Sequence, residues 1–414
     1  MRSTDAVVVG AGQAGLAISH EFTRLGIAHV VLERGRVAER WRSERWDSLR
    51  LLTPNWMNVL PGHAYAGPDP DGFMTMPEVI GFLDAYARRC EAPVEEGIEV
   101  LALHPAPGGY RIETNRGAWR ARVVVVATGH CGAPAVPRFA ARLPPCIHQV
   151  TASSYRSPAA LPAGGVLVVG AAASAVQIAE ELRLAGRDVV LSAGRHTRTP
   201  RSYRGRDIWW WMHYVGLLED RAEDQANIAR ARAQPSFQLT GTPPRRDLDL
   251  GTLRDAGVRI VGRTLGAEGR VLRFGGDLVE TIAGAQKPLE SMLARIDRTA
   301  DTMGVPREHW PVALEGFGAG PERLDLVAEG IRSVVWATGY RRDYGWLHLP
   351  GLLDADGDVH HRGGVTAARG LYLLGLRFLR RRSSNLLGGV GADAIAIAAE
   401  AARHLRHTER REAA

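Results

Sequence analysis

Two glycine-rich turns in this sequence have the residue types and spacing that hold the diphosphate of a dinucleotide. The first follows an apolar run and consists of Gly10-Ala11-Gly12-Gln13-Ala14-Gly15. In such a strand–turn–helix unit, the first glycine makes the tight turn, the second lets the backbone approach the phosphates, and the third allows helix and strand to pack closely. The helix N-terminus then offers free N–H groups and its dipole to the anion. Gly10, Gly12, Gln13, Ala14 and Gly15 are therefore predicted to bind a dinucleotide.

An acid stands at the distance that such a site requires. The apolar run Val30-Val31-Leu32 ends in Glu33, 23 residues after Gly10. A carboxylate at this place accepts the 2′-hydroxyl of a ribose, and its charge disfavours a 2′-phosphate. Glu33 thus favours a dinucleotide without a 2′-phosphate at the first turn.

A second copy of the unit begins about 160 residues later, with the turn Gly170-Ala171-Ala172-Ala173-Ser174-Ala175. Ser192 replaces the acid at the end of its second strand, Asp188–Ser192, and Arg195, His196, Arg198 and Arg201 follow. Loss of the acid and gain of cations is what a 2′-phosphate requires. We predict FAD at the first turn and NADPH at the second, where it is bound by Gly170, Ala172, Ser174, Ala175 and these four side chains.

Two observations weigh against a strong NADPH site. Ala172 carries a methyl group where the backbone should meet the pyrophosphate. The arginines also have a plainer interpretation as a solvated loop, because Lys287 is the only lysine and arginine supplies almost all of the positive charge. Two dinucleotide units in one chain nevertheless indicate electron transfer between two bound cofactors.

The elements around the turns indicate an α/β fold with two Rossmann-like, three-layer domains, the NADPH domain being inserted into the FAD domain. The predicted division is 1–155 for the first part of the FAD domain, 160–330 for the NADPH domain with a helical insertion, and 331–414 for the C-terminal part of the FAD domain. Further predicted helices are Met76–Cys90, Ser174–Ala185, Asp277–Thr302 and Ala392–Leu405, and further predicted strands are Glu99–Leu103, Tyr110–Thr114, Arg122–Ala127, Ile331–Ala337 and Leu371–Gly375.

Composition excludes several other classes. Apolar residues make up 45% and charged residues 23% of the 414, as in a globular protein of two or three domains. The net charge of +7 is scattered rather than gathered on a basic face, which argues against nucleic-acid binding. Three cysteines without Cys-x-x-Cys indicate no disulfide framework, zinc site or redox dithiol. No metal site is predicted, and the absence of a signal peptide or membrane-spanning run predicts a cytoplasmic protein.

Three consecutive tryptophans, Trp209, Trp210 and Trp211, lie in the predicted helical stretch Tyr203–Glu219. Successive positions on a helix point in different directions, so the three side chains cannot share one core. Packing between domains is the first interpretation. Lining of a substrate pocket and contact with a membrane surface are the alternatives.

The chain resembles the class B flavin-dependent monooxygenases and their bacterial relatives, and Leu373–Ala394 is similar to the C-terminal part of the plant YUCCA-type enzymes. The resemblance rests on both glycine turns and on the following stretches: Arg40-Trp41-Arg42, Trp46–Pro54, Ala127-Thr128-Gly129, Trp336–Tyr340 and Leu386–Gly391.

The resemblance implies further cofactor contacts. Trp46–Asn58 would line the flavin ring, with Asn55 and Thr53 as catalytic candidates and Asn58 competing with Asn55 for the role. The two Ala-Thr-Gly segments would be backbone crossings between domains. The other residues implied in cofactor binding are Arg34, Trp41, Arg42, Val100, Ala127, Thr128, Gly129, Ala337, Thr338, Gly339, Leu386 and Leu387.

The activity implied is that of an FAD- and NADPH-dependent monooxygenase. NADPH would reduce the flavin, O2 would add at flavin carbon 4a, and the (hydro)peroxide would oxygenate a small organic nucleophile such as an amine or sulfide. The Phe-x-Gly-x-x-x-His stretch of relatives is missing and His148 is out of register, which disfavours Baeyer–Villiger chemistry. The alternatives are a flavoprotein oxidase or dehydrogenase with a degenerate NADPH site, and a non-catalytic flavin-bound scaffold or redox sensor. A monomer or homodimer is expected.

Overall fold

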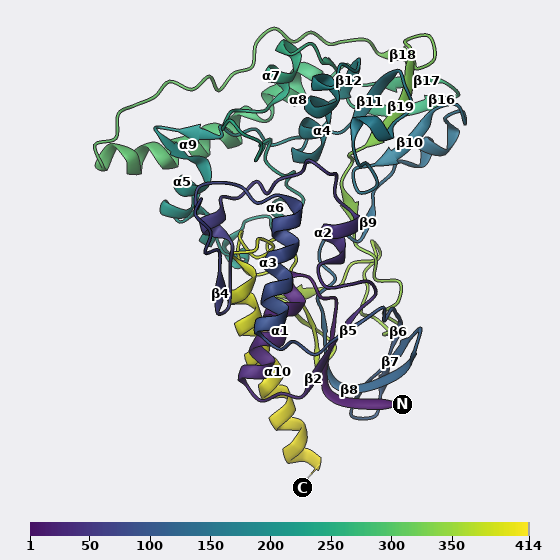
Figure 1. Cartoon of the computed structure of the whole chain (residues 1–414), viewed down its shortest axis with the longest axis vertical. Helices are drawn as coiled ribbons and strands as arrows, with labels where there is room; N and C mark the ends of the chain where they lie inside the picture. The colour runs from purple at the N-terminus through teal and green to yellow at the C-terminus, as the bar shows by residue number, and fades with distance from the viewer. Residues whose placement is uncertain (413–414) are drawn as a thin grey trace.

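The computed structural model describes residues 1–412, which form two α/β lobes (Figure 1). The first lobe is built on a nine-stranded sheet with the order β21-β22-β23-β8-β1-β2-β5, and β7 and β6 continue from β8. Its strands are β1 (Arg2–Val9), β2 (His29–Glu33), β5 (Val94–Glu96), β6 (Val100–Ala106), β7 (Gly109–Thr114), β8 (Gly117–Val126), β21 (His361–Arg362), β22 (Val365–Thr366) and β23 (Leu371–Leu373). β1 lies between β2 and β8, parallel to both.

The second lobe contains a five-stranded parallel sheet with the order β10-β19-β11-β12-β15. These strands are β10 (His148–Thr151), β11 (Gly165–Val169), β12 (Val189–Ser192), β15 (Arg259–Val261) and β19 (Ile331–Trp336). A three-stranded antiparallel sheet lies beside it, formed by β16 (Thr264–Glu268), β17 (Val271–Phe274) and β18 (Arg323–Asp325). The short pair β9 (Ala133–Pro134) and β20 (Tyr340–Arg341) lies where the chain passes between lobes, and two other hairpins are β3–β4 (Val59–Leu60, His63–Ala64) and β13–β14 (Ser202–Tyr203, Arg206–Asp207).

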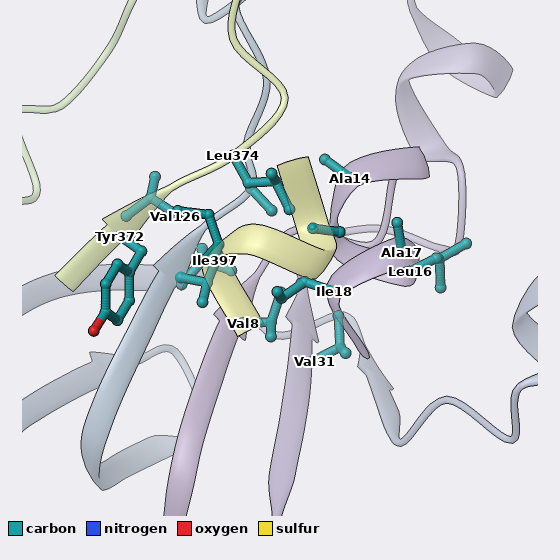
Figure 2. Close-up of a cluster of buried hydrophobic side chains, with 14 of the residues drawn as sticks. Val8, Ala14, Leu16, Ala17, Ile18, Val31, Val126, Tyr372, Leu374 and Ile397 are labelled. Carbon is teal, nitrogen blue, oxygen red and sulfur yellow. The ribbon is translucent and has the colours of Figure 1, made fainter. Parts of the chain in front are cut away.

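Helices α1 (Gln13–Arg24), α3 (Met76–Arg89) and α10 (Val390–Glu412) pack together on one side of the first sheet (Figure 1). Apolar residues on β1 and β8 meet them because alternate strand positions face the helices. Figure 2 shows Ile397 of α10 among Val8, Val126 and Ile18, all of which are buried. Each such side chain contributes about 1.5–3 kcal/mol on burial, so α10 fixes the first sheet from the far end of the chain.

In the second lobe, α4 (Ala173–Leu184) packs on the sheet. The helical insertion of this lobe contains α5 (Ile208–Tyr214), α6 (Ile228–Arg232), α7 (Leu250–Asp255), α8 (Leu278–Ala283) and α9 (Gln286–Thr302). The short helix α2 (Glu39–Ser43) belongs to the first lobe.

The three tryptophans of α5 occupy different environments. Trp209 and Trp211 are buried, whereas Trp210 is half-buried and stacks on the exposed ring of Tyr214. Trp209 and Trp211 nevertheless belong to one hydrophobic cluster, and Trp210 packs against it, so the prediction that the three cannot share one core is wrong.

The strand pairing changes the predicted division of the chain. β10 and β19 both belong to the second sheet, so the second lobe begins before 148 and ends after 336, rather than at 160 and 330. The strand predicted at Arg122–Ala127 is longer, because the first half of β8 also pairs antiparallel with β7. The helix predicted at Asp277–Thr302 is interrupted before α9, since Pro288 has no N–H to continue the ladder.

Two features are absent from the part of the chain that the structure describes. No helix within residues 1–412 is long and apolar enough to cross a membrane. Over the same range, no three His, Cys, Asp or Glu side chains gather as metal ligands would. His360 and His361 follow a turn in which Asp354 Oδ1 accepts the backbone N–H groups of Asp356 and Asp358 at 2.9 Å.

Asp393, in the first turn of α10, generates a pH prediction. Its side chain is 1% exposed, and burial raises the pKa of the carboxyl to about 6 in spite of Ser384, Arg380 and Arg381. The folded state therefore holds a proton that the unfolded state releases near pH 4, so this group's contribution to stability is lost as pH rises from 4 to 6. At about 1.4 kcal/mol per pKa unit, ionisation costs the folded state about 3 kcal/mol above pH 6.

We expect Asp393→Asn to raise the melting temperature relative to the wild type at pH 7.5, with a smaller gain at pH 4.5. Asp358→Asn is the control with the opposite sign, because the pKa of Asp358 is lowered by its contact with Arg342. Thermal unfolding at constant ionic strength measures both. A difference between Asp393→Asn and wild type that does not change with pH contradicts the prediction.

Candidate functional site

A cavity of about 550 Å³ lies at the carboxyl ends of the parallel strands of the first sheet. Ligands bind at this edge in open α/β sheets because the loops that follow the strands surround it. Of the predicted cofactor residues, those that line the cavity are Gly10, Gly12, Gln13, Ala14, Glu33, Arg34, Trp41, Thr53, Val100, Ala127, Thr128, Gly129, Leu386 and Leu387. We call it the flavin cavity, because FAD is the cofactor predicted for these residues.

The three glycines of the first turn differ in what surrounds them. Gly10 has φ +105, and a Cβ there would lie 2.9 Å from the carbonyl oxygen of Ala127. A Cβ on Gly15 would lie 1.8 Å from the carbonyl oxygen of Gly10. Gly12, by contrast, has φ −82 and no protein atom within 4 Å of an added Cβ. Gly10 and Gly15 are thus required by the protein itself, whereas the space at Gly12 is open on the cavity side.

Glu33 is fixed at the mouth of the turn. Its Oε2 accepts the N–H of Ala11 at 2.8 Å, and its Oε1 accepts the N–H of Gly35 at 2.9 Å. A carboxylate has about four acceptor positions, so two remain for ribose hydroxyl groups. The open space at Gly12 and the N-terminus of α1 would receive the pyrophosphate. The Glu33 carboxylate would receive the ribose. The residues present fit FAD.

Three arginines add positive charge to the lining of the flavin cavity, namely Arg40, Arg45 and Arg377. His130 also lines it. Burial, together with Arg377, Arg45 and Arg40, lowers the pKa of His130 to about 3, so this imidazole stays neutral in the working pH range. A diphosphate supplies the negative charge that such a wall favours.

The second turn repeats the backbone of the first. The N–H of Gly10 donates to the carbonyl oxygen of Leu32, as the N–H of Gly170 does to that of Ser192. The N–H of Ala127 donates to the carbonyl oxygen of Val9, as the N–H of Ala337 does to that of Val169. A Cβ on Gly170 would lie 2.3 Å from the carbonyl oxygen of Ala337. Ala172 is the residue before α4, as Gly12 is before α1, and Ala175 is fully buried. Ala337, Thr338 and Gly339 thus lie at the second crossing, where the Thr338 hydroxyl donates to the carbonyl of Ala135.

The prediction for the arginines after β12 needs correction. Arg198 and Arg201 are 5% and 1% exposed, and they pair with Asp249 at 2.6 Å and Asp207 at 2.5 Å. Their guanidinium groups are engaged inside the protein, which argues against contact with a 2′-phosphate. His196 is also buried, and its Nδ1 is hydrogen-bonded to the carbonyl oxygen of Gly194 at 3.0 Å.

Arg195 is the exception in this group. It is exposed, and its guanidinium group donates to the carbonyl oxygen of Ala233 at 2.8 Å, a neutral acceptor that does not cancel its positive charge. Ser192 occupies the position of the acid in the first copy. Its hydroxyl donates to the carbonyl of Gly262 and is hydrogen-bonded to the hydroxyl of Thr264. Of the four predicted side chains, Arg195 alone is placed to meet an anion from solvent.

Two predicted flavin-side residues have structural roles instead. The Asn55 side chain is buried; its Nδ2 donates to the carbonyl of Asp69 at 2.9 Å, and its Oδ1 accepts the N–H of Met74 at 2.9 Å. It holds the loop together and does not line the cavity, whereas Thr53 does. Arg42 binds both oxygens of Asp84 at 2.6–2.7 Å and thereby joins α2 to α3.

Part of the cavity wall was not predicted. It comes from the second lobe and from the segment after β23, and its members are Trp209, Leu218, Ala231, Gln234, Pro235, Ser236, Phe237, Arg377, Phe378, Arg382 and Asn385. The tryptophan run was a signal, since pocket lining was one interpretation of it. Ala231 lies in the short helix α6 and Leu218 in a 3-10 turn, and the rest lie in irregular segments. None of them belongs to a motif, so their position follows only from the folded chain.

Comparison with known proteins agrees with this geometry. The family model described as pyridine nucleotide-disulphide oxidoreductase matches residues 7–206. A CzcO-like oxidoreductase from Geobacillus kaustophilus is 33% identical over 94% of this chain and 96% of its own. The rice indole-3-pyruvate monooxygenase YUCCA8 (Oryza sativa subsp. indica) is 25% identical over 97% of this chain and 92% of its own.

Among solved structures, a flavin-containing monooxygenase from Stenotrophomonas maltophilia superposes with a TM-score of 0.69 at 20% identity, covering 98% of this chain and 99% of that one. Bacillithiol disulfide reductase from Staphylococcus aureus reaches 0.59 at 12% identity, covering 96% and 98%. These structures share the two-lobed fold. The relatives and the fold together show that this chain belongs to the flavin monooxygenase-like flavoproteins, in the family of the CzcO-like oxidoreductases.

Proposed function

We propose that this protein is an FAD- and NADPH-dependent monooxygenase that oxygenates a small organic nucleophile, such as a sulfide or an amine. The observation that carries the proposal is the repeated strand–turn–helix unit, with an open pyrophosphate space at Gly12 and a companion unit at Gly170. Two dinucleotide units allow one cofactor to reduce the other. The overall balance is substrate + O2 + NADPH + H⁺ giving oxygenated substrate + NADP⁺ + H2O.

The residues of this chain bind and enclose rather than act as acids or bases. Bound flavin supplies the chemistry, by accepting a hydride and activating O2. Thr53 and Leu387 line the flavin cavity from the first lobe, and Trp209 and Phe237 line it from the second. Leu387, Trp209 and Phe237 make this part of the lining apolar, and exclusion of water there would favour transfer of oxygen to substrate over its loss as H2O2. Burial and the nearby arginines lower the pKa of His130 to about 3, so its imidazole is neutral at neutral pH and does not act as an imidazolium acid.

One alternative has support of its own. A flavoprotein oxidase or dehydrogenase that does not use NADPH would accommodate the methyl group of Ala172 and the internal pairing of Arg198 and Arg201. The two functions differ in the source of the electrons. Anaerobic mixing of the flavin-loaded protein with NADPH separates them, since the monooxygenase loses its flavin absorbance and the oxidase does not.

We expect NADPH to bleach the flavin anaerobically, and aerobic turnover with thioanisole (methyl phenyl sulfide) to give sulfoxide in step with NADPH and O2 consumed. Stopped-flow absorbance and product analysis by chromatography measure these. A flavin that neither NADPH nor NADH reduces would falsify the monooxygenase proposal.

Gly12→Val tests the flavin cavity. The backbone at Gly12 suits any L-residue, and no protein atom lies within 4 Å of its Cβ, so the variant should fold while its side chain occupies the pyrophosphate space. We expect purified apoprotein with unchanged circular dichroism. Gly81→Val is the matched control, because Gly81 also has open space around it but lies on α3, away from the cavity. Normal flavin content in Gly12→Val contradicts the FAD assignment.

Arg195→Ala tests the nicotinamide site. A charge-assisted phosphate contact is worth about 1.5–3 kcal/mol, so kcat/KM for NADPH should fall roughly 10- to 100-fold while that for NADH stays nearly constant. Arg198→Met is the comparison. It leaves Asp249 buried without its cation, and we expect it to lower the melting temperature without discriminating between the coenzymes. Equal losses with both coenzymes in Arg195→Ala would rule out a role for Arg195 in 2′-phosphate recognition.

A further inference from the structure

A second cavity, of about 350 Å³, has a lining that is part apolar and part cationic. Its volume is within the range of small-molecule pockets. Three arginines line it, namely Arg198, Arg295 and Arg382. Half of its lining residues are apolar, and they are Met212, Leu217, Phe237, Pro288, Leu289 and Met292. A molecule in this cavity would therefore meet both apolar side chains and fixed positive charge.

Arg295 and Arg382 share a single carboxylate. Asp220 Oδ1 accepts Nη1 of Arg295, and Asp220 Oδ2 accepts Nη2 of Arg382, both at 3.1 Å. The neighbouring Glu219 does not line the cavity and pairs with Arg381 at 3.0 Å. Two guanidinium groups on one carboxylate leave a positive charge unmatched. That charge attracts an anion.

Both guanidinium groups keep N–H donors for such an anion, because each has five. Besides Asp220, Arg295 donates to the carbonyl oxygen of Val215 at 2.8 Å, and Arg382 donates to Oε1 of Gln234 at 3.4 Å. These two acceptors are neutral and leave the charge in place. The side chains of Arg295 and Arg382 are 36% and 24% exposed, so solvent reaches them. A carboxylate bound there need not lose all of its water, which lowers the cost of its desolvation.

Arg198 does not contribute to this unmatched charge. Its Nε donates to Asp249 Oδ2 at 2.6 Å, and its Nη1 donates to the carbonyl oxygens of Pro311 and Val312 at 2.9 and 2.6 Å. The charge available to a ligand therefore comes from α9 and from the segment after β23, and not from the loop after β12 that was predicted to bind the second dinucleotide.

A layer of side chains lies between this cavity and the flavin cavity. Gln234, Phe237 and Arg382 line both of them. Phe237 packs edge-on against Trp209 of the flavin cavity, with 6.0 Å between ring centroids. Arg295 lines the second cavity and not the flavin cavity. A molecule bound by Arg295 is thus separated by this layer from the place where oxygenation would occur.

We propose that the second cavity binds a monocarboxylate with a short apolar body, and that this ligand is distinct from the substrate and from both dinucleotides. Arg295 and Arg382 bind its carboxylate. The apolar lining, which includes the flexible thioethers of Met212 and Met292, adapts to its body. The inference does not depend on the proposed function, because it concerns binding and not oxygenation.

The test changes the charge of the cavity in both directions. Arg295→Met removes a cation, and Asp220→Asn removes the shared carboxylate. Arg298→Met is the matched control, because Arg298 is exposed on α9 and does not line the cavity. Calorimetric titration of each flavin-loaded protein uses octanoate and octanamide as probes, which have nearly the same size and differ in charge. Circular dichroism and flavin content check that each variant is folded.

We expect octanoate to bind to wild type and to Arg298→Met about 10- to 100-fold more tightly than octanamide, as a charge-assisted hydrogen bond provides. Arg295→Met should lower the octanoate affinity to that of octanamide. Asp220→Asn should raise the octanoate affinity about 10-fold, because the ligand then replaces the lost carboxylate. The octanamide affinity should stay the same in all four proteins, and saturating NADP⁺ should not displace octanoate.

Several results would overturn the inference. They are equal affinities of wild type for the two probes, no binding of octanoate to wild type, and an octanoate affinity that neither Arg295→Met nor Asp220→Asn changes. Displacement of octanoate by NADP⁺ would also overturn it, since Arg295 and Arg382 would then belong to the second dinucleotide site. The opposite signs expected for the two variants keep a general loss of stability from imitating the predicted result.

Discussion

The close approach of each glycine turn to the crossing segment beside it is the constraint on which both lobes depend. At Gly10 an added Cβ would meet the carbonyl oxygen of Ala127 at 2.9 Å, and at Gly170 that of Ala337 at 2.3 Å. Both glycines also have positive φ, which L-residues with a side chain rarely adopt. The chain leaves each sheet through these crossings. The turn that would hold a dinucleotide and the passage between lobes are therefore fixed by the same backbone contact.

Much of this framework could be predicted from the sequence, because its determinants are local. A β-branched run, glycines at fixed spacing and an amphipathic helix follow one another within about 20 residues at each copy. Glu33 was found in the same way, and its carboxylate lies where the spacing indicated, on the N–H groups of Ala11 and Gly35. The domain limits were less accurate, because β10 and β19 pair across about 180 residues and no local pattern reports such a pairing.

The arginines after β12 show why the rest could not be predicted. Their position after the strand is local information, but their partners are not. Asp249, which neutralises Arg198, lies 51 residues away and is fixed in space by the N-terminus of α7. The sequence shows that cations replace an acid; only the folded chain shows that Arg198 and Arg201 point inward and that Arg195 stays exposed. Asn55 failed for a similar reason, since the backbone groups of Asp69 and Met74 take its amide.

The pairing of arginines differs along the wall that the flavin cavity shares with its neighbour. Arg377, which lines the flavin cavity, bonds the neutral oxygens of Gln234 and Ser236. In the neighbouring cavity Arg198 pairs with Asp249, whereas Arg295 and Arg382 share the one carboxylate of Asp220. A guanidinium group whose partners are neutral oxygens keeps its attraction for an anion. The lining at Arg377 therefore suits an anionic cofactor, in addition to the helix N-terminus that follows Gly12.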